Sequence, residues 1–230
     1  MKDVLGKALS DYQHRLSPAR LWINNKYGPR EEMLVSIYFR RAEEMPELEW
    51  IALQKCRGKI LDIGAGAGSH ALALSQMGHD VTALDSSPLA AAVMEERGVQ
   101  KIVCQDFFEL AGAASFDTLL LLMNGIGLAG TLSGLRLFLA QARRLIHPGG
   151  QLLFDSSDIA YMYEGNPPPM EEYYGEILYQ YEYKRQKSDW FRWLFIDRKK
   201  LTEIARSEGW STELLFEDGY DQFLVKCLSI

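Results

Sequence analysis

The spacing of hydrophobic residues changes along the chain, and each spacing predicts a different kind of element. In residues 1–57 the apolar positions recur every three or four residues, over 4–12 and again over 46–56, which predicts helices rather than strands. From residue 59 onward, short apolar runs alternate with helical patterns. Such alternation favours an α/β fold built on an open, mostly parallel sheet with helices on both faces.

Seven strands are expected in this sheet. The apolar runs predict strands over residues 60–63, 80–85, 101–104, 116–122, 151–155, 211–216 and 222–228. The clearest helix precedes the fifth strand, because Leu132, Leu135 and Phe138 share one face, and residues 147–150, which read His-Pro-Gly-Gly, are expected to end it. A further helix is predicted over residues 198–208.

The pattern also predicts how the chain is organised. Residues 1–57 are expected to form an N-terminal helical cover, and residues 58–230 the main domain, with an insertion at residues 156–197. Within the cover, the apolar and aromatic stretches 21–23 and 33–39 are separated by a turn. These two stretches can cover a pocket, or they can simply pack against the main domain.

The insertion has two parts. Residues 160–175 contain the run Pro167–Pro169, which is too rich in proline for regular structure, so a loop is expected there. Residues 176–184 then alternate with a period of two, and residues 190–197 alternate in the same way. Both segments are rich in aromatic residues, so they predict an aromatic β-hairpin.

A glycine-rich turn joins the first predicted strand to the next helix. It reads Gly64-Ala65-Gly66-Ala67-Gly68, and its glycines allow positive φ angles and let a ligand approach the bare backbone. The helix begins near Ser69, where unpaired N–H groups and the positive end of the helix dipole would face a polar group. The turn therefore predicts a site for a nucleotide-like ligand.

Polar residues stand at the carboxyl ends of the first five predicted strands. They are Asp62, Asp85, Asp106, Asn124 and Asp155. In open α/β sheets the ligand binds outside these strand ends. Asp85 can accept both ribose hydroxyls of an adenosine, whereas Asp106 can accept from the adenine amino group while Phe107 covers the ring. An adenosine-containing ligand fits this set.

Composition and charge limit the partners. A formal net charge of −6 and an isoelectric point near 5.3 argue against a nucleic-acid partner, and the basic residues around 184–187 are expected to form a solvated turn. The three cysteines are far apart, which suggests neither a disulfide framework nor a metal site. The sequence contains no long apolar run and no signal-peptide pattern, so we expect a cytoplasmic protein with no membrane partner.

Four sequence elements, in order, resemble the class I S-adenosylmethionine-dependent methyltransferases. They are Leu-Asp-Ile-Gly-Ala-Gly-Ala-Gly, Ala-Leu-Asp-Ser-Ser-Pro, Cys-Gln-Asp-Phe-Phe and His-Pro-Gly-Gly-Gln-Leu-Leu-Phe, and the resemblance covers residues 58–155 well. A dinucleotide-binding dehydrogenase would instead have Gly-x-Gly-x-x-Gly, whose third glycine falls at position 69, where this chain has Ser69.

The resemblance implies S-adenosylmethionine as cofactor, S-adenosylhomocysteine as product, and a last strand that runs antiparallel. The implied cofactor-binding residues are Asp62, Gly64, Ala65, Gly66, Gly68, Asp85, Ser86, Asp106, Phe107 and Asn124. Asp62 would hold the cofactor's amino group, the glycines would lie under its methionine part, and Asp85 would hold the ribose.

Methyl transfer from a sulfonium needs mainly in-line positioning, so the chemistry does not by itself single out a residue that accepts a proton. The candidate catalytic residues are Asn124, Asp155 and His70. His70 lies at the start of a predicted helix, where a histidine more often packs or caps. Asp155 can equally hydrogen-bond the backbone of the following loop.

The acceptor is expected to be a small organic or cationic molecule, because the chain is acidic and residues 1–50 and 156–197 are rich in aromatic side chains. The same aromatic residues can equally form a hairpin core or the surface of a homodimer. Two alternatives stay open: an NAD(P)-dependent oxidoreductase, and a non-catalytic S-adenosylmethionine-binding or assembly protein.

Overall fold

The computed structural model describes residues 2–16, 19–112, 115–163 and 172–230. A seven-stranded sheet has the strand order β11-β12-β7-β6-β3-β4-β5. Its strands are β3 (Lys59–Ile63), β4 (Asp80–Asp85), β5 (Ile102–Cys104), β6 (Phe116–Leu121), β7 (Ile146–Ser157), β11 (Trp210–Glu217) and β12 (Gln222–Ser229). β4 and β5 pair in parallel, as do β6 and β7, whereas β12 is antiparallel to both β7 and β11. The predicted α/β fold with an antiparallel last strand is confirmed.

The chain divides into two compact units. Unit 1 comprises Met1–Met45, Asp62–Leu110 and Leu178–Phe191, and unit 2 comprises Pro46–Leu61, Ala111–Ile177 and Arg192–Ile230. Strand β3 is shared, because the division falls between Leu61 and Asp62. The boundary at residue 57 and the insertion at residues 156–197 remain predictions.

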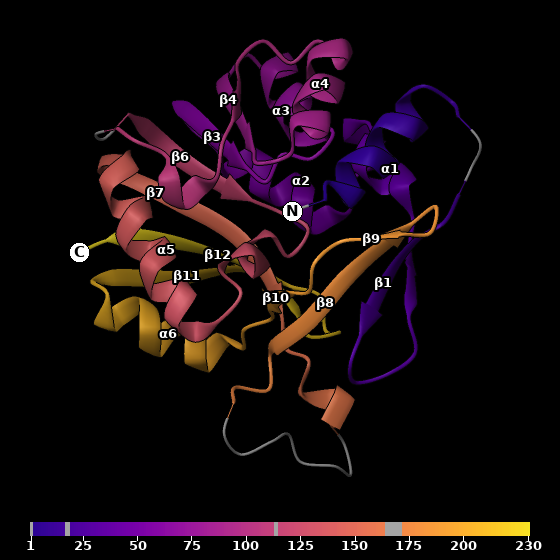
Figure 1. Ribbon diagram of the computed structural model, residues 1–230. Coiled ribbons are helices and arrows are strands. Elements are labelled where there is room, and N and C mark those ends of the chain that lie inside the picture. The colour runs from indigo at the N-terminus through magenta and orange to yellow at the C-terminus, as the bar shows by residue number, and fades with distance from the viewer. Residues whose placement is uncertain (1, 17–18, 113–114, 164–171) are drawn as a thin grey trace. The chain divides into compact units, whose positions relative to one another are not determined.

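Unit 1 holds the glycine turn, which lies between β3 and helix α3 (Ser69–Gln76). Helix α4 (Pro88–Arg97) follows β4, and the Oγ of Ser87 caps it by accepting a hydrogen bond from the N–H of Ala90 at 2.9 Å, as the sequence predicts. Figure 1 shows α3 and α4 beside β4. Helix α1 (Val4–Gln13) packs against α4, so the N-terminal segment contacts the elements that follow the glycine turn.

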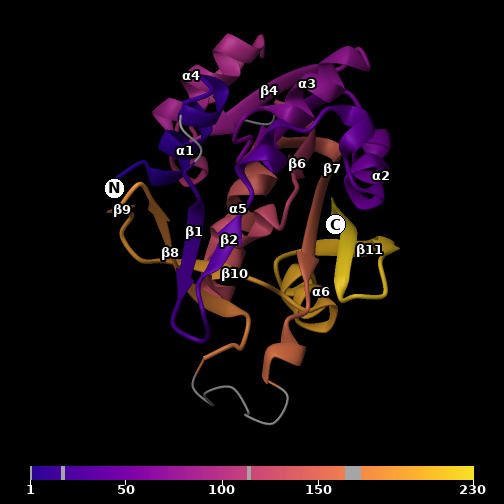
Figure 2. The same ribbon diagram turned by 90° about the vertical axis from the view of Figure 1, so that its right-hand side faces the viewer.

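Two strands lie in the first 57 residues, so the prediction of helices without strands is wrong there. Strands β1 (Leu21–Asn25) and β2 (Glu31–Met33) pair antiparallel around a turn, in which the Asn25 Oδ1 accepts from the N–H groups of Tyr27 and Gly28 at 2.8 and 2.7 Å. Figure 2 shows β1 between β2 and β8 (Glu176–Tyr183). Because β8 comes much later in the sequence, the local pattern of residues 21–33 gave no sign of this pairing.

Several short elements complete unit 1. They are η1 (Val35–Phe39), η2 (Ala42–Glu44), η3 (Phe107–Glu109) and β9 (Gln186–Lys187). β9 pairs with β8, and the turn between them contains Lys184 and Arg185 with φ angles of 46° and 64°. The predicted basic hairpin turn is therefore confirmed.

Unit 2 contains helices α2 (Glu47–Lys55), α5 (Leu132–Leu145) and α6 (Arg198–Ser207), the short helices η4 (Gly125–Ala129) and η5 (Ala160–Tyr163), and most of strand β10 (Phe191–Leu194). As predicted, α5 buries one face, with Leu135, Phe138 and Leu139 inaccessible to solvent. Figure 1 shows α5 beside α6, which in turn packs on β11.

Two predicted boundaries in unit 2 are wrong. Residues 147–150 do not separate α5 from the next strand, because β7 already begins at Ile146, where an irregularity in its pairing with β6 accommodates the proline and glycines. Residues 160–163 form η5 instead of a loop. The run Pro167–Pro169 lies outside the described residues.

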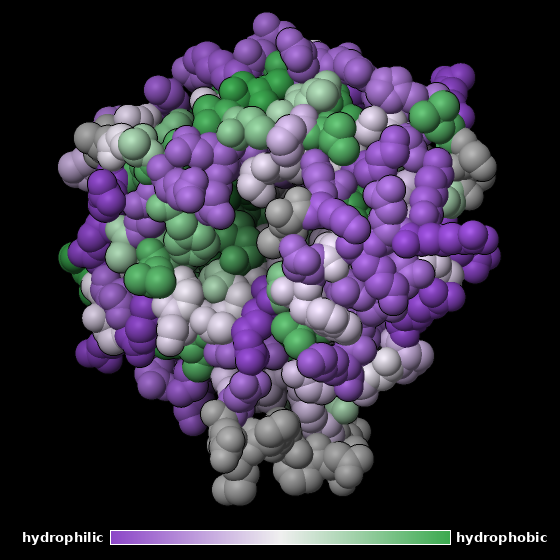
Figure 3. Space-filling model, in the orientation of Figure 1, coloured by the Kyte–Doolittle hydropathy of each residue, from purple (hydrophilic) through white to green (hydrophobic). Residues whose placement is uncertain are grey.

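Hydrophilic residues cover most of the face shown in Figure 3, with hydrophobic residues between them in small groups. Across the described parts of the chain, no helix combines the length and the apolar character needed to cross a bilayer. The described histidine, cysteine and acidic side chains also form no group of three or more that could hold a metal ion.

A buried carboxylate ties α1 to the β8–β9 hairpin in unit 1. Asp11 is 1% exposed and lies 2.9 Å from the Nζ of Lys7 and 2.7 Å from the Nζ of Lys184, and the Tyr183 hydroxyl donates to it at 3.2 Å. Burial alone would raise the pKa of Asp11, but the two lysines outweigh it and hold that pKa below its usual range. The ionised carboxylate therefore stabilises the folded state.

Asp11→Asn should lower the free energy of unfolding by about 2 kcal/mol at pH 7, because it removes charge-assisted hydrogen bonds from a buried site. The lowered pKa means that this contribution is present above the ordinary aspartate pKa and is lost as the pH falls through the folded value. Urea unfolding at pH 7 and pH 3.5 measures both effects. Equal stability of wild type and variant at pH 7 would contradict the role given to Asp11, and Glu203→Gln, which removes an exposed ion pair with Lys200, is the control.

Candidate functional site

The three glycines of the turn have left-handed backbones but different surroundings. Their φ angles are 73°, 57° and 80° at Gly64, Gly66 and Gly68, so all three need the left-handed region. A Cβ on Gly64 would meet no described atom within 4 Å, whereas one on Gly66 would stand 3.1 Å from the ring of Tyr38. A Cβ on Gly68 would stand 2.8 Å from Val99, so this glycine serves close packing. The open space lies at Gly64.

Asp85 fixes the turn to the end of β4. Its Oδ2 accepts from the Gly66 N–H at 2.8 Å and its Oδ1 accepts from the Ser87 N–H at 2.9 Å. Burial raises the pKa of Asp85, although these backbone donors oppose the shift. Each carboxylate oxygen has a second lone pair, so the side chain can hold the turn and still accept from a ligand. Ser86, predicted beside it, is exposed.

Asp62 is a buried acid with an unused oxygen. It is 2% exposed, and its Oδ2 has no hydrogen-bond partner among the residues that the structure describes. Burial raises the pKa of Asp62 to about 6, although the nearby His70 lowers it in part. His70 is itself 7% exposed at the start of α3. A buried acceptor of this kind is costly unless a donor, above all a cationic one, is bound to it.

The acid predicted for adenine lies at the start of η3. Asp106 is exposed, and its Oδ1 accepts from the Phe108 N–H at 2.8 Å, so one oxygen caps the short helix. Phe107 is 4% exposed, and its ring centroid lies 5.6 Å from that of Phe108. Asp106 and Phe107 thus lie just after β5 in unit 1, and their role in binding adenine stays a prediction.

Two candidate catalytic residues meet in unit 2. Both carboxylate oxygens of Asp155 lie 2.9 Å from the backbone N of Asn124, and Gln222 donates to one of them at 3.1 Å. Asp155 is 1% exposed, and burial raises its pKa to about 6 although these donors oppose the shift. The side chain of Asp155 thus holds the backbone after β6 rather than the loop after its own strand, which is the alternative that the sequence offered.

The backbone at Asn124 is strained. Met123 and Asn124 have φ angles of 62° and 55°, which are uncommon for residues other than glycine. The Asn124 Nδ2 donates to the Leu194 carbonyl at 3.2 Å, while its buried Oδ1 has no hydrogen-bond partner in the described part of the chain. Strain and an unsatisfied polar atom are both features of functional sites.

Sequence reasoning missed residues that hold these groups in place. In unit 1 the Arg97 guanidinium donates to the Ala67 carbonyl and to the Ser69 Oγ, and the Ser69 Oγ donates to the Tyr38 carbonyl at 2.7 Å. In unit 2 Gln222 supports Asp155. Arg97 looks in the sequence like an ordinary basic residue near a helix end, so only the three-dimensional contacts show its role.

Most of the aromatic side chains in the two segments expected to face the acceptor already contact other residues of the protein. The Trp22 ring lies 4.1 Å below the Arg30 guanidinium, and Lys26 lies 5.5 Å from the Trp190 ring. In unit 2 the hydroxyls of Tyr173 and Tyr174 donate to Asp197 and Asp158 at 2.6 and 2.7 Å. Trp193 packs on the bare backbone of Gly127. Tyr27 and Tyr161 are exposed.

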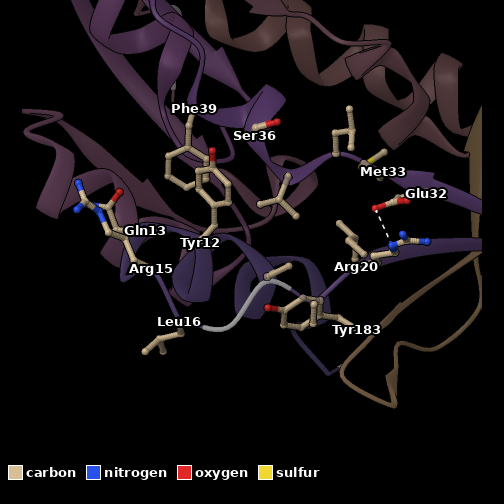
Figure 4. A pocket seen from close by; sticks show the side chains of 15 residues that line it. Tyr12, Gln13, Arg15, Leu16, Arg20, Glu32, Met33, Ser36, Phe39 and Tyr183 are labelled. Carbon is tan, nitrogen blue, oxygen red and sulfur yellow. Dashed lines mark ion pairs between the residues drawn. The ribbon is translucent and has the colours of Figure 1, made fainter.

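A cavity of about 860 Å³ lies elsewhere in unit 1, between α1, β2 and η1. Figure 4 shows Tyr12 and Phe39 side by side in its wall, with ring centroids 4.6 Å apart, and the ion pair between Arg20 and Glu32. The described lining of this cavity does not include the residues predicted to bind a cofactor.

Comparison with known proteins identifies the family. Residues 61–154 match the family model of a methyltransferase domain. A solved S-adenosylmethionine-dependent methyltransferase from Bacteroides fragilis, in complex with S-adenosyl-L-homocysteine, is 39% identical, with a TM-score of 0.93 over 99% of this chain and 95% of its own. The CcbJ methyltransferase from Streptomyces caelestis shares the fold at 14% identity, with a TM-score of 0.61 over 84% of this chain and 95% of its own.

A curated relative from Geobacillus sp. (strain WCH70) is 30% identical over 102 residues, which are 42% of this chain and 41% of that relative. The aligned part thus spans less than half of that relative's length. Because the Bacteroides fragilis protein matches over almost its whole chain, this chain belongs to the S-adenosylmethionine-dependent methyltransferases, and its cofactor is S-adenosylmethionine.

The residues of unit 1 fit this cofactor. The unpartnered Oδ2 of Asp62 suits an ammonium group, and the space beside Gly64 suits a chain passing close to the backbone. Asp85 retains lone pairs for the ribose hydroxyls. The assignment of individual cofactor-binding and catalytic residues remains a prediction that mutagenesis can test.

Asp62→Asn should stabilise the protein without cofactor, by about 1–3 kcal/mol at pH 7.5, because the native state no longer buries a charge. Since the folded pKa is about 6 and the ordinary value 3.8, the native state loses stability as the pH rises between these values. The gain should therefore shrink towards zero near pH 4. Urea unfolding across this range is the measurement, with exposed Asp80→Asn as the control. A gain in the free energy of unfolding that does not change with pH would show that the native state does not bury a charged Asp62.

Asn124→Ala should be less stable than Asn124→Gly by about 1 kcal/mol, because both lose the side-chain hydrogen bond but only alanine resists the left-handed backbone. Outside such a conformation, glycine is normally the less stable of the two. Urea unfolding of the two variants under identical conditions compares them directly. An alanine variant as stable as the glycine variant would show that the strain at residue 124 is absent.

Proposed function

We propose that this protein transfers the methyl group of S-adenosylmethionine to a small organic acceptor. The observation that carries the cofactor-binding part of the proposal is the buried Asp62 Oδ2, which lacks a hydrogen-bond partner among the described residues of a chain that belongs to this family. A buried carboxylate oxygen without a donor costs free energy, and the cofactor's ammonium group would remove that cost.

Three groups of unit 1 would hold the cofactor. Asp62 binds its amino group, Asp85 accepts from the ribose hydroxyls, and Asp106 with Phe107 binds the adenine. When bound, S-adenosylmethionine supplies a methyl group already activated by its sulfonium. The protein then contributes orientation and exclusion of water rather than a difficult bond cleavage.

The three candidate catalytic residues have different roles in this proposal. Asp155 accepts the Asn124 N–H with both oxygens, so we assign it to positioning Asn124 rather than to proton transfer. His70 lies near Asp62 and opposes the rise in the pKa of Asp62, so we assign it to supporting this acid. Asn124, with its unpartnered Oδ1 among the described residues, is the one of the three best suited to accept a hydrogen bond from a ligand.

The small acceptor is supported by charge. A net charge of −6 disfavours polyanionic acceptors such as nucleic acids, whereas neutral or cationic organic molecules meet no such repulsion. A cytoplasmic location, the absence of nucleic-acid and membrane partners, and a homodimer remain predictions. The oxidoreductase alternative loses its support, because the relative at 39% identity binds S-adenosyl-L-homocysteine.

The proposal has a direct test. Purified protein is incubated with S-adenosylmethionine carrying a labelled methyl group and a panel of small amines, phenols and carboxylic acids, with tRNA and a protein mixture as further acceptors. Transfer to a small molecule is expected. Transfer only to the tRNA or the protein mixture would overturn the acceptor class, and cofactor binding without any transfer would favour the non-catalytic alternative.

Asp85→Ala should weaken S-adenosylhomocysteine binding by about 2–4 kcal/mol, because it removes charged hydrogen bonds to the ribose and also those that hold the turn. Asp85→Asn keeps the shape and one acceptor oxygen, so its loss should be smaller. Isothermal titration calorimetry measures both. Unchanged affinity in Asp85→Ala would remove this residue from the site.

A further inference from the structure

Two tyrosines from distant parts of the sequence lie beside the glycine turn in unit 1. The ring of Tyr38, in η1, stands 3.1 Å from the point where a Cβ on Gly66 would lie. Tyr181, in β8, is close enough to Tyr38 and to Asp85 to interact with both electrostatically. The Tyr38 ring, a bare glycine and the half-buried acid at the end of β4 therefore lie close together, with Tyr181 within electrostatic range of Tyr38 and Asp85.

Tyr38 is held firmly in this position. The Ser69 Oγ donates to its carbonyl at 2.7 Å, and the Arg97 guanidinium reaches the same carbonyl at 3.4 Å. The Tyr38 hydroxyl donates to the Met33 Sδ at 3.0 Å, so its polar end is already used. What Tyr38 offers to a ligand at the turn is therefore the ring, not the hydroxyl.

Tyr181 is held by the sheet that contains β8 and β1. It lies opposite Ile23 of β1, and its backbone N–H donates to the Ser188 Oγ at 3.0 Å. Its ring centroid lies 5.0 Å from that of Phe191. These contacts fix the ring before any ligand arrives, which lowers the entropic cost of binding.

Both phenols are neutral at physiological pH, as ordinary tyrosines are, and their surroundings raise the pKa of each further. Burial raises the pKa of Tyr181 to about 12, and Asp85 adds to this; the pKa of Tyr38 is also raised well above its ordinary value by burial, Tyr181 and Asp85. Each residue still keeps part of its surface accessible. The pair thus offers neutral, partly accessible rings next to a carboxylate, an environment that strengthens hydrogen bonds to that carboxylate by excluding water.

We propose that Tyr38 and Tyr181 are further cofactor-binding residues, an aromatic pair that packs on the ribose end of the cofactor where Asp85 holds it. This inference rests on the proposed function for the role of Asp85. It gives the N-terminal segment and the β8 hairpin a role in cofactor binding, whereas the sequence suggested that they cover a pocket, select the acceptor, pack on the main domain or form a dimer surface. The rings act by contact and by shielding the hydrogen bonds of Asp85 from water.

Calorimetric titration with S-adenosylhomocysteine tests the pair. Tyr38→Leu and Tyr181→Leu should each weaken binding by about tenfold or more, whereas Tyr38→Phe and Tyr181→Phe should stay within about threefold of wild type, because the ring is retained. Tyr12→Leu is the matched control, since Tyr12 packs on Phe39 in the wall of the cavity and should leave the affinity unchanged. Leucine variants that bind like wild type would overturn the inference.

S-adenosylmethionine and S-adenosylhomocysteine differ in the charge at sulfur, so comparing their affinities shows which part of the cofactor the two rings contact. If they pack on the ribose end, the loss in each leucine variant should be the same for cationic S-adenosylmethionine and for neutral S-adenosylhomocysteine. A larger loss for S-adenosylmethionine would indicate contact with the sulfonium and would overturn the ribose placement. These affinities are measured without methyl transfer, so the variants can be compared even while the acceptor is unidentified. If the wild-type protein bound neither S-adenosylmethionine nor S-adenosylhomocysteine, both this inference and the proposed function would be wrong.

Hydroxyl-radical footprinting tests the same inference on the wild-type protein, so its result does not depend on whether the variants fold. Added S-adenosylhomocysteine should protect Tyr38 and Tyr181 from oxidation, and it should not protect Tyr220, which is 86% exposed. Equal oxidation of Tyr38 and Tyr181 with and without the compound would show that the two rings serve only the packing of their own segments.

Discussion

The hydrogen bonds that Asp85 accepts from Gly66 and Ser87 are the interaction on which the site depends. They fix the middle of the glycine turn, where Gly66 has a left-handed backbone, to the end of β4. The Tyr38 ring packs on the backbone that this shape exposes at Gly66. Without the carboxylate, the turn would keep its backbone hydrogen bonds from Gly64 and Ala65 to the Leu84 carbonyl, but the cofactor would lose its proposed partner for the ribose.

The site is built at a cost in stability. Asp62 and Asp155 are buried acids whose pKa values burial raises to about 6, and Met123 and Asn124 have strained backbones. Within unit 2, Asp155 offsets part of its own cost by accepting the Asn124 N–H. Asp62 has no such compensation at its Oδ2 from the described residues, which is why we expect the cofactor, rather than the protein, to complete its hydrogen bonding.

The sequence predicted the parts of the fold that depend on local pattern. Strand periodicity and the glycine turn indicated the α/β sheet and the strand-end acids, because each follows directly from residues that are neighbours in sequence. The β1–β2 hairpin was missed, since β1 is stabilised by β8, far along the chain. Tyr38 and Tyr181 were missed as a pair for the same reason, and the contacts of Arg97 and Gln222 have no sequence signature.

We infer that the turn from Gly64 to Ser69 and the residues after Asp85 form the cofactor site. Hydrogen–deuterium exchange of the wild-type protein, with and without S-adenosylhomocysteine, tests it most directly. We expect slower exchange in peptides covering residues 62–69 and 85–90, and unchanged exchange in the peptide covering the β11–β12 turn. Exchange that stays the same at the glycine turn while the compound is bound would contradict it.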